Sequence, residues 1–340
     1  MNEGEENHPE KPQEQKVINE EEVNRKTTVI EITSPKDAPK FDNLIQQNNL
    51  DADVEILSLS NINLTSLEFF KNEHFKRVVI LELTNCFLST LDNISDIQGL
   101  RFLNLCTNKI SSLDQFSQKE FKDLQILILS NNAIESLSPI KECKFPKLIK
   151  LDLSNNKINN IADLTANESL KELEALYLNQ NFIKSVDELE NAKFTKIKEL
   201  QFTCNEIENV DVFAKVGFNE LVELYLRDNK IKDISKLVKG NFQKLEKLSL
   251  GKNEINDIDS LKNANWDNLK QLDLFDNKIT DVDVFKTIFY KLEELDLSFN
   301  QIPNFGIFDK RVIKNLNRTH NIEEEENNNE IKRDITCKGD

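Results

Sequence analysis

Few side chains in this chain of 340 residues have the types and spacing that catalysis or metal binding requires. It contains three histidines, too few for a rich metal or acid–base site, and five cysteines without paired spacing. The acidic pairs Glu208 with Asp211 and Asp281 with Asp283 have the groups for acid–base chemistry, but they recur at one phase of a repeated pattern, as solvated loop charges do. We find no phosphate loop, nucleophile elbow or zinc or calcium spacing. The sequence therefore predicts a protein that is not an enzyme and uses no cofactor and no metal.

The overall charge narrows the classes of partner. Lys and Arg total 44 against 60 Asp and Glu, which gives a net charge of −16. Nucleic acids and anionic membrane surfaces would repel such a chain, so neither is expected as a partner. The first residues contain no apolar run, and no stretch approaches 18 consecutive apolar residues. Together with the unpaired cysteine pattern, this predicts a cytoplasmic or nuclear protein with reduced thiols.

From Val54 onward the sequence contains an internal repeat with a period close to 24 residues, and this repeat determines the structural elements. The segments LVELYLRDNKIKDISKL (221–237) and LEKLSLGKNEINDIDSL (245–261) show the pattern clearly. Position four is Leu throughout, position six is almost always Leu, and position nine is Asn in nine of eleven units. The units begin at Val54, Val78, Leu100, Leu124, Leu148, Leu173, Ile197, Leu221, Leu245, Leu269 and Leu292.

Each repeated position has a physical role. Alternating leucines at positions four and six predict a short strand with one buried face, which stacking of the units must cover. The Asn amide can both donate and accept, so it is expected to pair with backbone groups where the chain turns after the strand. An aromatic three residues before most units is expected to fill the core behind the sheet. These residues are Phe75, Phe121, Phe145, Phe194, Phe218, Phe242, Trp266 and Phe289.

The pattern L-x-x-L-x-L-x-x-N-x-I-x-x-I-x-x-L resembles that of leucine-rich repeat proteins, over residues 54 to about 308. Segments such as NKIKDISKL and NEINDIDSL are similar to the subtype found in the leucine-rich regulatory subunit of protein phosphatase 1 and in bacterial internalins. The resemblance implies an α/β solenoid, or horseshoe. About eleven parallel strands would line its concave face, and irregular or 3₁₀ turns would form its convex face.

The composition outside the repeats predicts the domain organisation. Residues 1–40 are expected to form a disordered acidic arm, and residues 313–340 a disordered acidic tail. Residues 41–53 are expected to cap the solenoid of residues 54–312 through a short amphipathic helix that presents Phe41, Leu44 and Ile45.

Residues that flank the buried leucines of each strand are expected to point into the concave groove. Its N-terminal third carries an apolar row that starts at Ile56, and its later strands carry aromatic residues among acids. Either the N-terminal segment covers the apolar row, or the row binds a partner. The candidate partner-binding residues are Ile80, Phe102, Ile126, Ile128, Tyr177, Glu199, Glu223, Tyr225, Arg227, Asp273, Phe275 and Asp296.

These observations predict a monomeric scaffold that binds a partner protein in its concave groove. The acids of the groove would favour a partner with basic residues at its rim. Two alternatives remain open: a regulatory subunit of a phosphatase resembling the regulator of protein phosphatase 1, or the targeting fragment of a larger enzyme. A third class, a surface adhesion protein like the internalins, is disfavoured by the apparent lack of a secretory signal.

Overall fold

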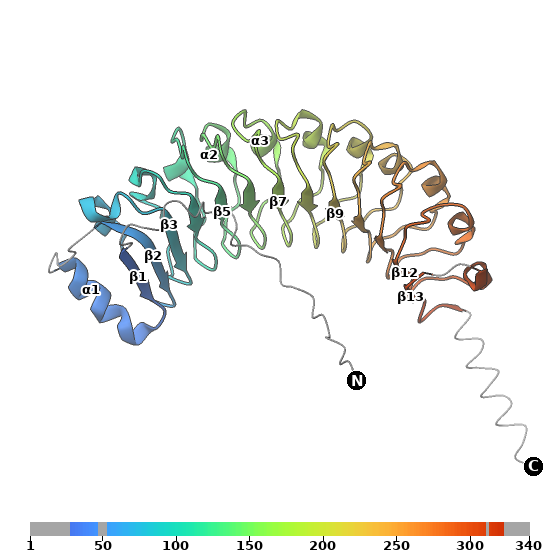
Figure 1. The fold of residues 1–340 in the computed structure, drawn as a ribbon, viewed down its shortest axis with the longest axis horizontal. Coiled ribbons are helices and arrows are strands. Elements are labelled where there is room, and N and C mark those ends of the chain that lie inside the picture. The colour runs from blue at the N-terminus through green and yellow to red at the C-terminus, as the bar shows by residue number, and fades with distance from the viewer. Residues whose placement is uncertain (1–27, 47–52, 311–312, 323–340) are drawn as a thin grey trace, which may run out of the picture.

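The repeats stack into an arc with a parallel β-sheet along its inner side (Figure 1). The computed structural model describes residues 28–46, 53–310 and 313–322. Within these residues thirteen strands pair in chain order, each with the next. The strands are β1 (Thr28–Ile32), β2 (Val54–Ser60), β3 (Ile80–Thr84), β4 (Phe102–Asn104), β5 (Ile126–Ile128), β6 (Lys150–Asp152), β7 (Ala175–Tyr177), β8 (Glu199–Gln201), β9 (Glu223–Tyr225), β10 (Lys247–Ser249), β11 (Gln271–Asp273), β12 (Glu294–Asp296) and β13 (Asn315–Asn317).

The outer side of the arc is built from short helical turns. Its α-helices are α2 (Ser138–Lys141) and α3 (Ala162–Thr165), whereas α1 (Ala38–Gln46) lies at the N-terminal end of the arc (Figure 1). The 3₁₀ turns cover Pro35–Asp37, Glu68–Lys71, Glu73–Phe75, Ile94–Asp96, Asp114–Phe116, Asp187–Asn191, Asp211–Ala214, Leu237–Lys239, Asp259–Asn263, Asp283–Lys286 and Gly306–Lys310. Neighbouring strands of a sheet lie only ~4.8 Å apart, whereas helical segments need wider spacing, so the sheet lies on the inner side of the curve.

The eleven repeats predicted from the sequence correspond to β2–β12. The position-four leucines of successive strands lie opposite one another, as Leu200 lies opposite Leu176 and Leu224 opposite Leu200. These side chains are fully buried. The predicted solenoid with a concave parallel sheet and 3₁₀ turns behind it is therefore confirmed.

The N-terminal boundary of the solenoid differs from the prediction. β1 lies within residues 1–40, which were expected to be disordered, and it pairs with β2. Its residues Ile30 and Ile32 lie opposite Leu57 and Leu59 and are buried, so they extend the core by one strand. The prediction is wrong here because two alternating isoleucines in a five-residue strand do not stand out from polar surroundings. Residues 1–27 lie outside the described residues.

The C-terminal boundary also differs from the prediction. β13 and the loop after it form a shortened twelfth unit inside the segment 313–340, which was expected to be a disordered tail. The amide of Asn321 donates to Leu297 O at 3.0 Å and its Oδ1 accepts from Ile302 N–H at 3.0 Å. Asn321 thus repeats the role of the position-nine Asn and caps the array. The rest of the predicted tail, from residue 323, lies outside the described residues.

The predicted capping helix begins earlier than expected. It is α1, Ala38–Gln46, whereas the sequence placed the cap at residues 41–53. Phe41 is buried and its ring meets Phe69 edge-on with centroids 5.1 Å apart, while Ile45 packs partly buried against the core. These contacts close the N-terminal end of the core. Residues 47–52 lie outside the described residues.

The position-nine asparagines form a hydrogen-bonded ladder along the solenoid. Asn229 is typical: its Nδ2 donates to Phe202 O at 2.9 Å and to Leu226 O at 3.0 Å, and its Oδ1 accepts from Ile207 N–H at 3.0 Å. One buried amide therefore satisfies backbone groups of its own unit and of the preceding unit. This confirms the predicted role of the Asn position.

The aromatic residues before each unit form a spine inside the core. All eight predicted members are buried, which confirms that they fill the core. Several rings stack at similar spacing: Phe121 on Phe145 with centroids 5.5 Å apart, and Trp266 on Phe289 at 6.1 Å. Burial of each such ring contributes ~1.5–3 kcal/mol to folding, and favourable ring geometry adds to this.

Trp266 allows a test of the spine, because the other members are phenylalanines. Its Nε1 is buried and has no hydrogen-bond partner among the described residues. Trp266→Phe removes this unsatisfied donor and also some packing volume, so the two effects oppose each other. We expect the free energy of unfolding to change by less than about 1 kcal/mol. Urea denaturation of both proteins measures it, and a loss above about 3 kcal/mol would show that the lost packing volume outweighs removal of the unsatisfied donor.

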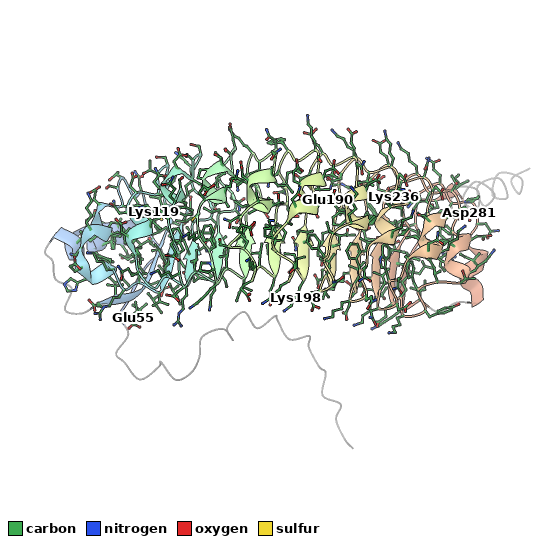
Figure 2. The ribbon with its side chains drawn as sticks, turned by 90° about the horizontal axis from the view of Figure 1, so that it is seen from above. Glu55, Lys119, Glu190, Lys198, Lys236 and Asp281 are labelled. Atoms are coloured by element: carbon green, nitrogen blue, oxygen red, sulfur yellow. The ribbon has the colours of Figure 1, made fainter. Side chains whose placement is uncertain are left out.

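Charged side chains of both signs cover the outer surface of the arc (Figure 2). Many pair across neighbouring repeats, such as Lys193 with Glu168 at 3.2 Å and Lys215 with Glu190 at 2.8 Å. Exposed pairs of this kind each contribute only ~0–1 kcal/mol. Among the described residues, the helices are too short or too polar to cross a membrane.

Candidate functional site

The concave face carries every side chain that the sequence selected as a candidate for partner binding. The strands place alternate residues on this face, because their neighbours, such as Leu103 and Leu127, point into the core. The structure divides the selected residues into an apolar region on the first strands and a polar and aromatic region from β7 to β12. Their role in binding remains a prediction.

The apolar region is a row of side chains in strict register. Ile56, Ile80, Phe102 and Ile126 lie opposite one another on β2, β3, β4 and β5, and each is half-buried. Ile128 lies two residues further along β5, beside the row. The row ends at β6, where Lys150 lies opposite Ile126.

The sequence interpretation missed Val29, which continues the row onto β1. Val29 lies opposite Ile56 and is 53% exposed. The described part of the N-terminal segment therefore lengthens the apolar row, although one alternative was that the segment covers it. The alternation of Val29 and Glu31 with the buried Ile30 and Ile32 was the available signal.

The two tyrosines of the groove are held by acids of the concave face, Tyr177 by an acid of the next strand and Tyr225 by an acid of its own strand. Tyr177 OH donates to Glu199 Oε2 at 2.7 Å, and Tyr225 OH donates to Glu223 Oε2 at 2.7 Å. Partial burial raises the pKa of both phenols, and the adjacent carboxylates raise these pKa values further. Both tyrosines therefore remain protonated donors at neutral pH, with their rings fixed on the concave face.

Cations of the groove are also engaged within the chain. The Nζ of Lys247 lies 2.8 Å from Glu223 Oε1, and the pKa of Lys247 is raised by this hydrogen bond. Lys150 Nζ lies over the Tyr177 ring, 4.8 Å from its centroid. Internal cations thus offset part of the negative charge of the groove.

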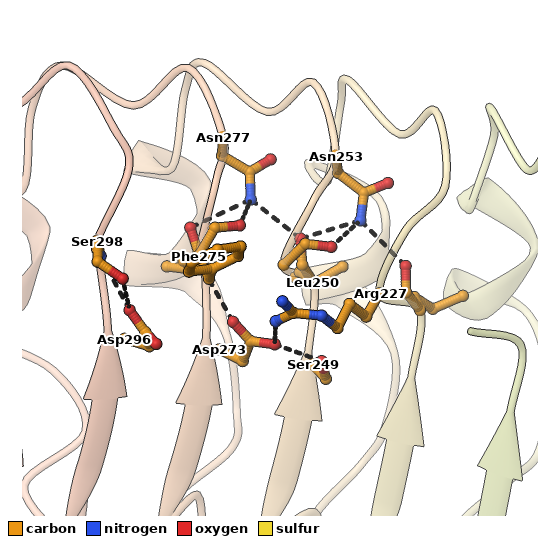
Figure 3. A network of polar contacts seen from close by, with 12 residues as sticks. Arg227, Ser249, Leu250, Asn253, Asp273, Phe275, Asn277, Asp296 and Ser298 are labelled. Carbon is orange, nitrogen blue, oxygen red and sulfur yellow. Dashed lines mark hydrogen bonds and ion pairs between the residues drawn. The ribbon is translucent and has the colours of Figure 1, made fainter. Parts of the chain in front are cut away.

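Arg227 forms a bridge across three repeats, shown in Figure 3. Its Nη1 lies 2.8 Å from Asp273 Oδ2, and the guanidinium lies over the Phe275 ring at 4.6 Å from the centroid. Asp273 also accepts from Ser249 Oγ at 2.7 Å and from Phe275 N–H at 3.0 Å. Arg227 was selected from the sequence as a candidate partner-binding residue, and within the chain it contacts Asp273 and Phe275.

Gly251 makes this bridge possible, and the sequence interpretation missed it. It occupies position seven of the repeat that the Arg227 side chain crosses. A Cβ at this position would lie 2.6 Å from Asp273 Oδ1 and 2.7 Å from Arg227 Nη1. Any other residue would therefore displace one of the two partners. A glycine two residues after a strand, in a chain with seven glycines, was the available signal.

Two further aromatic residues extend the bridge towards the C-terminus. Phe275 lies 5.2 Å from Phe299, and Phe299 stacks on the ring of His320 at 4.2 Å, centroid to centroid. Phe299 is 44% exposed and has a φ of 57°, which is unusual for a bulky residue. The sequence interpretation selected neither residue, and His320 lies in the segment that was assigned to the tail.

A hollow of about 340 Å³ opens beside this bridge on the concave face. Tyr225, Lys247 and Asp273 line it on one side, and Asp296 and Asn317 on the other. Asp296 Oδ1 accepts from Ser298 N–H at 2.9 Å and its Oδ2 accepts from Asn317 at 3.2 Å. Fixed polar groups around an open hollow suit the binding of polar side chains of another molecule better than a deeply enclosed small ligand.

The cysteines among the described residues are free thiols, and two of them are buried. Cys86, Cys106, Cys143 and Cys204 form no disulfide with one another. Burial raises the pKa of Cys86 to about 11 and that of Cys143 to about 12. Both thiols are therefore protonated at neutral pH, which makes them poor nucleophiles.

The repeats form a leucine-rich repeat solenoid, and models of leucine-rich repeat families match parts of the chain. The family described as Leucine rich repeat matches residues 98–158, and that described as Leucine Rich repeats (2 copies) matches residues 219–263 and 267–310. These matches lie in the repeats that carry the two regions of the concave face. They do not distinguish the phosphatase-regulator subtype. A comparison with curated protein sequences found no significant match.

Solved structures similar to the chain include two internalins of Listeria monocytogenes. The internalin inlF is 24% identical with a TM-score of 0.68, and the similarity covers 79% of this chain and 75% of that one. The internalin C2 is 28% identical with a TM-score of 0.50, covering 58% of this chain and 81% of that one. The similarity to inlF supports the solenoid fold.

A plant receptor shares the same fold. The plant peptide hormone receptor RGFR1, solved in complex with RGF2, is 20% identical with a TM-score of 0.57. The similarity covers 87% of this chain but 47% of the receptor chain, so this chain spans about half of the receptor's length. At this identity the similarity shows the fold alone.

Proposed function

We propose that the chain is a protein-interaction scaffold that holds a partner protein against its concave face. The observation that carries this proposal is the Arg227 bridge beside the open hollow. Arg227, Asp273 and Phe275 are fixed by one another before any partner arrives, at a site where Gly251 has no side chain to interfere. Aromatic residues and arginines fixed in this way are typical of protein interfaces.

The length of the concave surface favours a protein as the binding partner over a small molecule. The candidate residues extend from β3 to β12, which at ~4.8 Å per strand is a surface about 43 Å long. The receptor RGFR1 offers a parallel, since its structure is a complex with RGF2. Glu199, Glu223 and Asp296 would favour basic residues at the rim of the partner, and Tyr177 and Tyr225 would supply anchors.

Of the two narrower alternatives, regulation of a phosphatase rests on repeat subtype alone. Regulation of protein phosphatase 1 and service as the targeting fragment of a larger enzyme both use a binding surface, so they are versions of the same proposal. No contact at the site favours either of them. Action as a monomer in the cytosol or nucleus likewise remains a prediction.

Affinity purification with mass spectrometry tests the proposal. The full chain, Tyr225→Ala, and Lys262→Ala as a control are used as baits. Lys262 is exposed in the 3₁₀ turn Asp259–Asn263, on the convex side of a nearby repeat. A partner retained by the wild type and by Lys262→Ala but depleted with Tyr225→Ala is the expected result. Recovery of a phosphatase catalytic subunit would select the phosphatase alternative. Loss of the partner only with Lys262→Ala would contradict the concave-face proposal.

A further inference from the structure

The apolar row on the first five strands has a regular geometry that suggests the shape of its occupant. We call Val29, Ile56, Ile80, Phe102 and Ile126 the apolar stripe. Each lies on a different strand and opposite the next, from β1 to β5. Apolar rows of this length on an exposed sheet face mark interaction sites more often than chance exposure.

The spacing of the stripe is close to that of an α-helix. Neighbouring strands lie ~4.8 Å apart, so the stripe spans roughly 19 Å over four steps. On one face of a helix, apolar residues at i, i+4, i+7, i+11 and i+14 span about 21 Å, because each residue rises 1.5 Å. A helix that runs across the strands can therefore place one apolar side chain near each member of the stripe.

Acidic residues flank the stripe on the same face. Glu31 is exposed on β1 and lies opposite Ser58, and Glu82 lies opposite Ser58 on its other side. Ser58 Oγ donates to Glu82 Oε2 at 2.8 Å, which holds this carboxylate beside the stripe. Glu55 precedes Ile56 on the opposite flank, where Arg101 precedes Phe102. The charged residues of the flank that contains Glu31 and Glu82 are both acidic, so this flank complements basic side chains.

We propose that the apolar stripe binds the apolar face of one amphipathic helix, about 15 residues long, from a partner protein. The Lys or Arg residues of this helix lie along the flank of Glu31 and Glu82. This inference rests on the proposed function and specifies the partner segment for its N-terminal region. The Arg227 bridge and the hollow, further along the groove, contact the remainder of the partner.

Binding of a designed peptide to the full chain tests the inference. The probe is a fluorescein-labelled peptide of about 15 leucines and lysines with leucines at helical spacing. The control peptide has the same composition, but its leucines and lysines alternate, as in a strand. Fluorescence anisotropy is expected to show at least about tenfold tighter binding of the helical probe than of the control.

Substitutions at position three of the repeat locate the binding site. Ile80→Gln with Ile126→Gln is expected to weaken probe binding at least about tenfold. These changes are compatible with folding, because Gln271 occupies the same position in another repeat. Gln271→Ala serves as the control and is expected to change binding less than about twofold. Glu31→Gln with Glu82→Gln is expected to weaken binding about threefold or more and to reduce its dependence on salt.

Four outcomes would overturn the inference: equal binding of the two peptides, unchanged binding of the Ile80→Gln/Ile126→Gln protein, dimerisation through the stripe, or probe binding only after removal of residues 1–27. Light scattering detects the dimer, and the last outcome would show that these residues occupy the stripe. A captured partner that loses affinity with Tyr225→Ala but not with Ile80→Gln/Ile126→Gln would leave the proposed function intact and overturn this inference alone.

Discussion

Phe242→Ala is expected to lower the free energy of unfolding by about 3–5 kcal/mol. The Phe242 side chain is fully buried, meets the Phe213 ring edge-on at 6.1 Å, and lies close against Gly240. Removal of the ring leaves a cavity that the neighbouring repeats cannot fill, because their own spine residues are fixed in register. Chemical denaturation followed by circular dichroism measures the loss.

Phe182→Ala provides the matched control for this prediction. Phe182 is 52% exposed and lies outside the spine, so its replacement should change stability by less than about 1 kcal/mol. Equal losses for the two substitutions would show that the spine does not stabilise the stacking of the repeats. Because stability in such arrays is carried by interfaces between neighbours, Phe242→Ala should also broaden the unfolding transition.

Asn229→Ala is expected to destabilise the protein by about 1–3 kcal/mol. The substitution removes the amide that donates to Phe202 O and Leu226 O, and it leaves the Ile207 N–H without its acceptor. These backbone groups lie inside the solenoid, where water cannot replace the lost partner without disrupting the packing. Equilibrium denaturation of both proteins measures the difference.

Asn159→Ala is the control for the Asn ladder, since Asn159 is exposed. It should unfold within about 0.5 kcal/mol of the wild type. A change near zero for Asn229→Ala would show that the buried amide contributes nothing beyond its packing, and the proposed function of the ladder would be wrong.

The repeats could be predicted from the sequence because one structural unit recurs with little variation. A leucine at position four and an asparagine at position nine each have one physical role, and repetition makes that role visible. Leu224 and Asn229 therefore lie where the sequence placed them. The two ends of the solenoid lack this repetition, so the role of each residue there is harder to recognise. β1 carries only two inward isoleucines, and β13 belongs to a shortened unit in which Arg318 stands where the repeats carry Leu.

The sequence could predict which side chains lie on the concave face, but not which contacts these side chains make with one another. Alternation along a strand determines which side chains share a face, so Tyr225, Asp273 and Phe275 could be assigned to the groove. The two-residue alternation along a strand does not determine the direction in which a long side chain extends across the sheet. Arg227 reaches across a whole repeat to Asp273 because Gly251 leaves space, and this arrangement requires three residues of three units at once.

Binding of the captured partner to three purified proteins is the most direct test of the central claim, that the concave face is the recognition surface. Kd and rates are measured for the wild type, Tyr225→Ala and Lys262→Ala, each confirmed to be folded. We predict that Tyr225→Ala loses about 1–3 kcal/mol of binding, mainly through faster dissociation. Lys262→Ala should change binding by less than about 0.5 kcal/mol. Wild-type affinity for Tyr225→Ala with loss of binding for Lys262→Ala would contradict the account and assign recognition to the convex side.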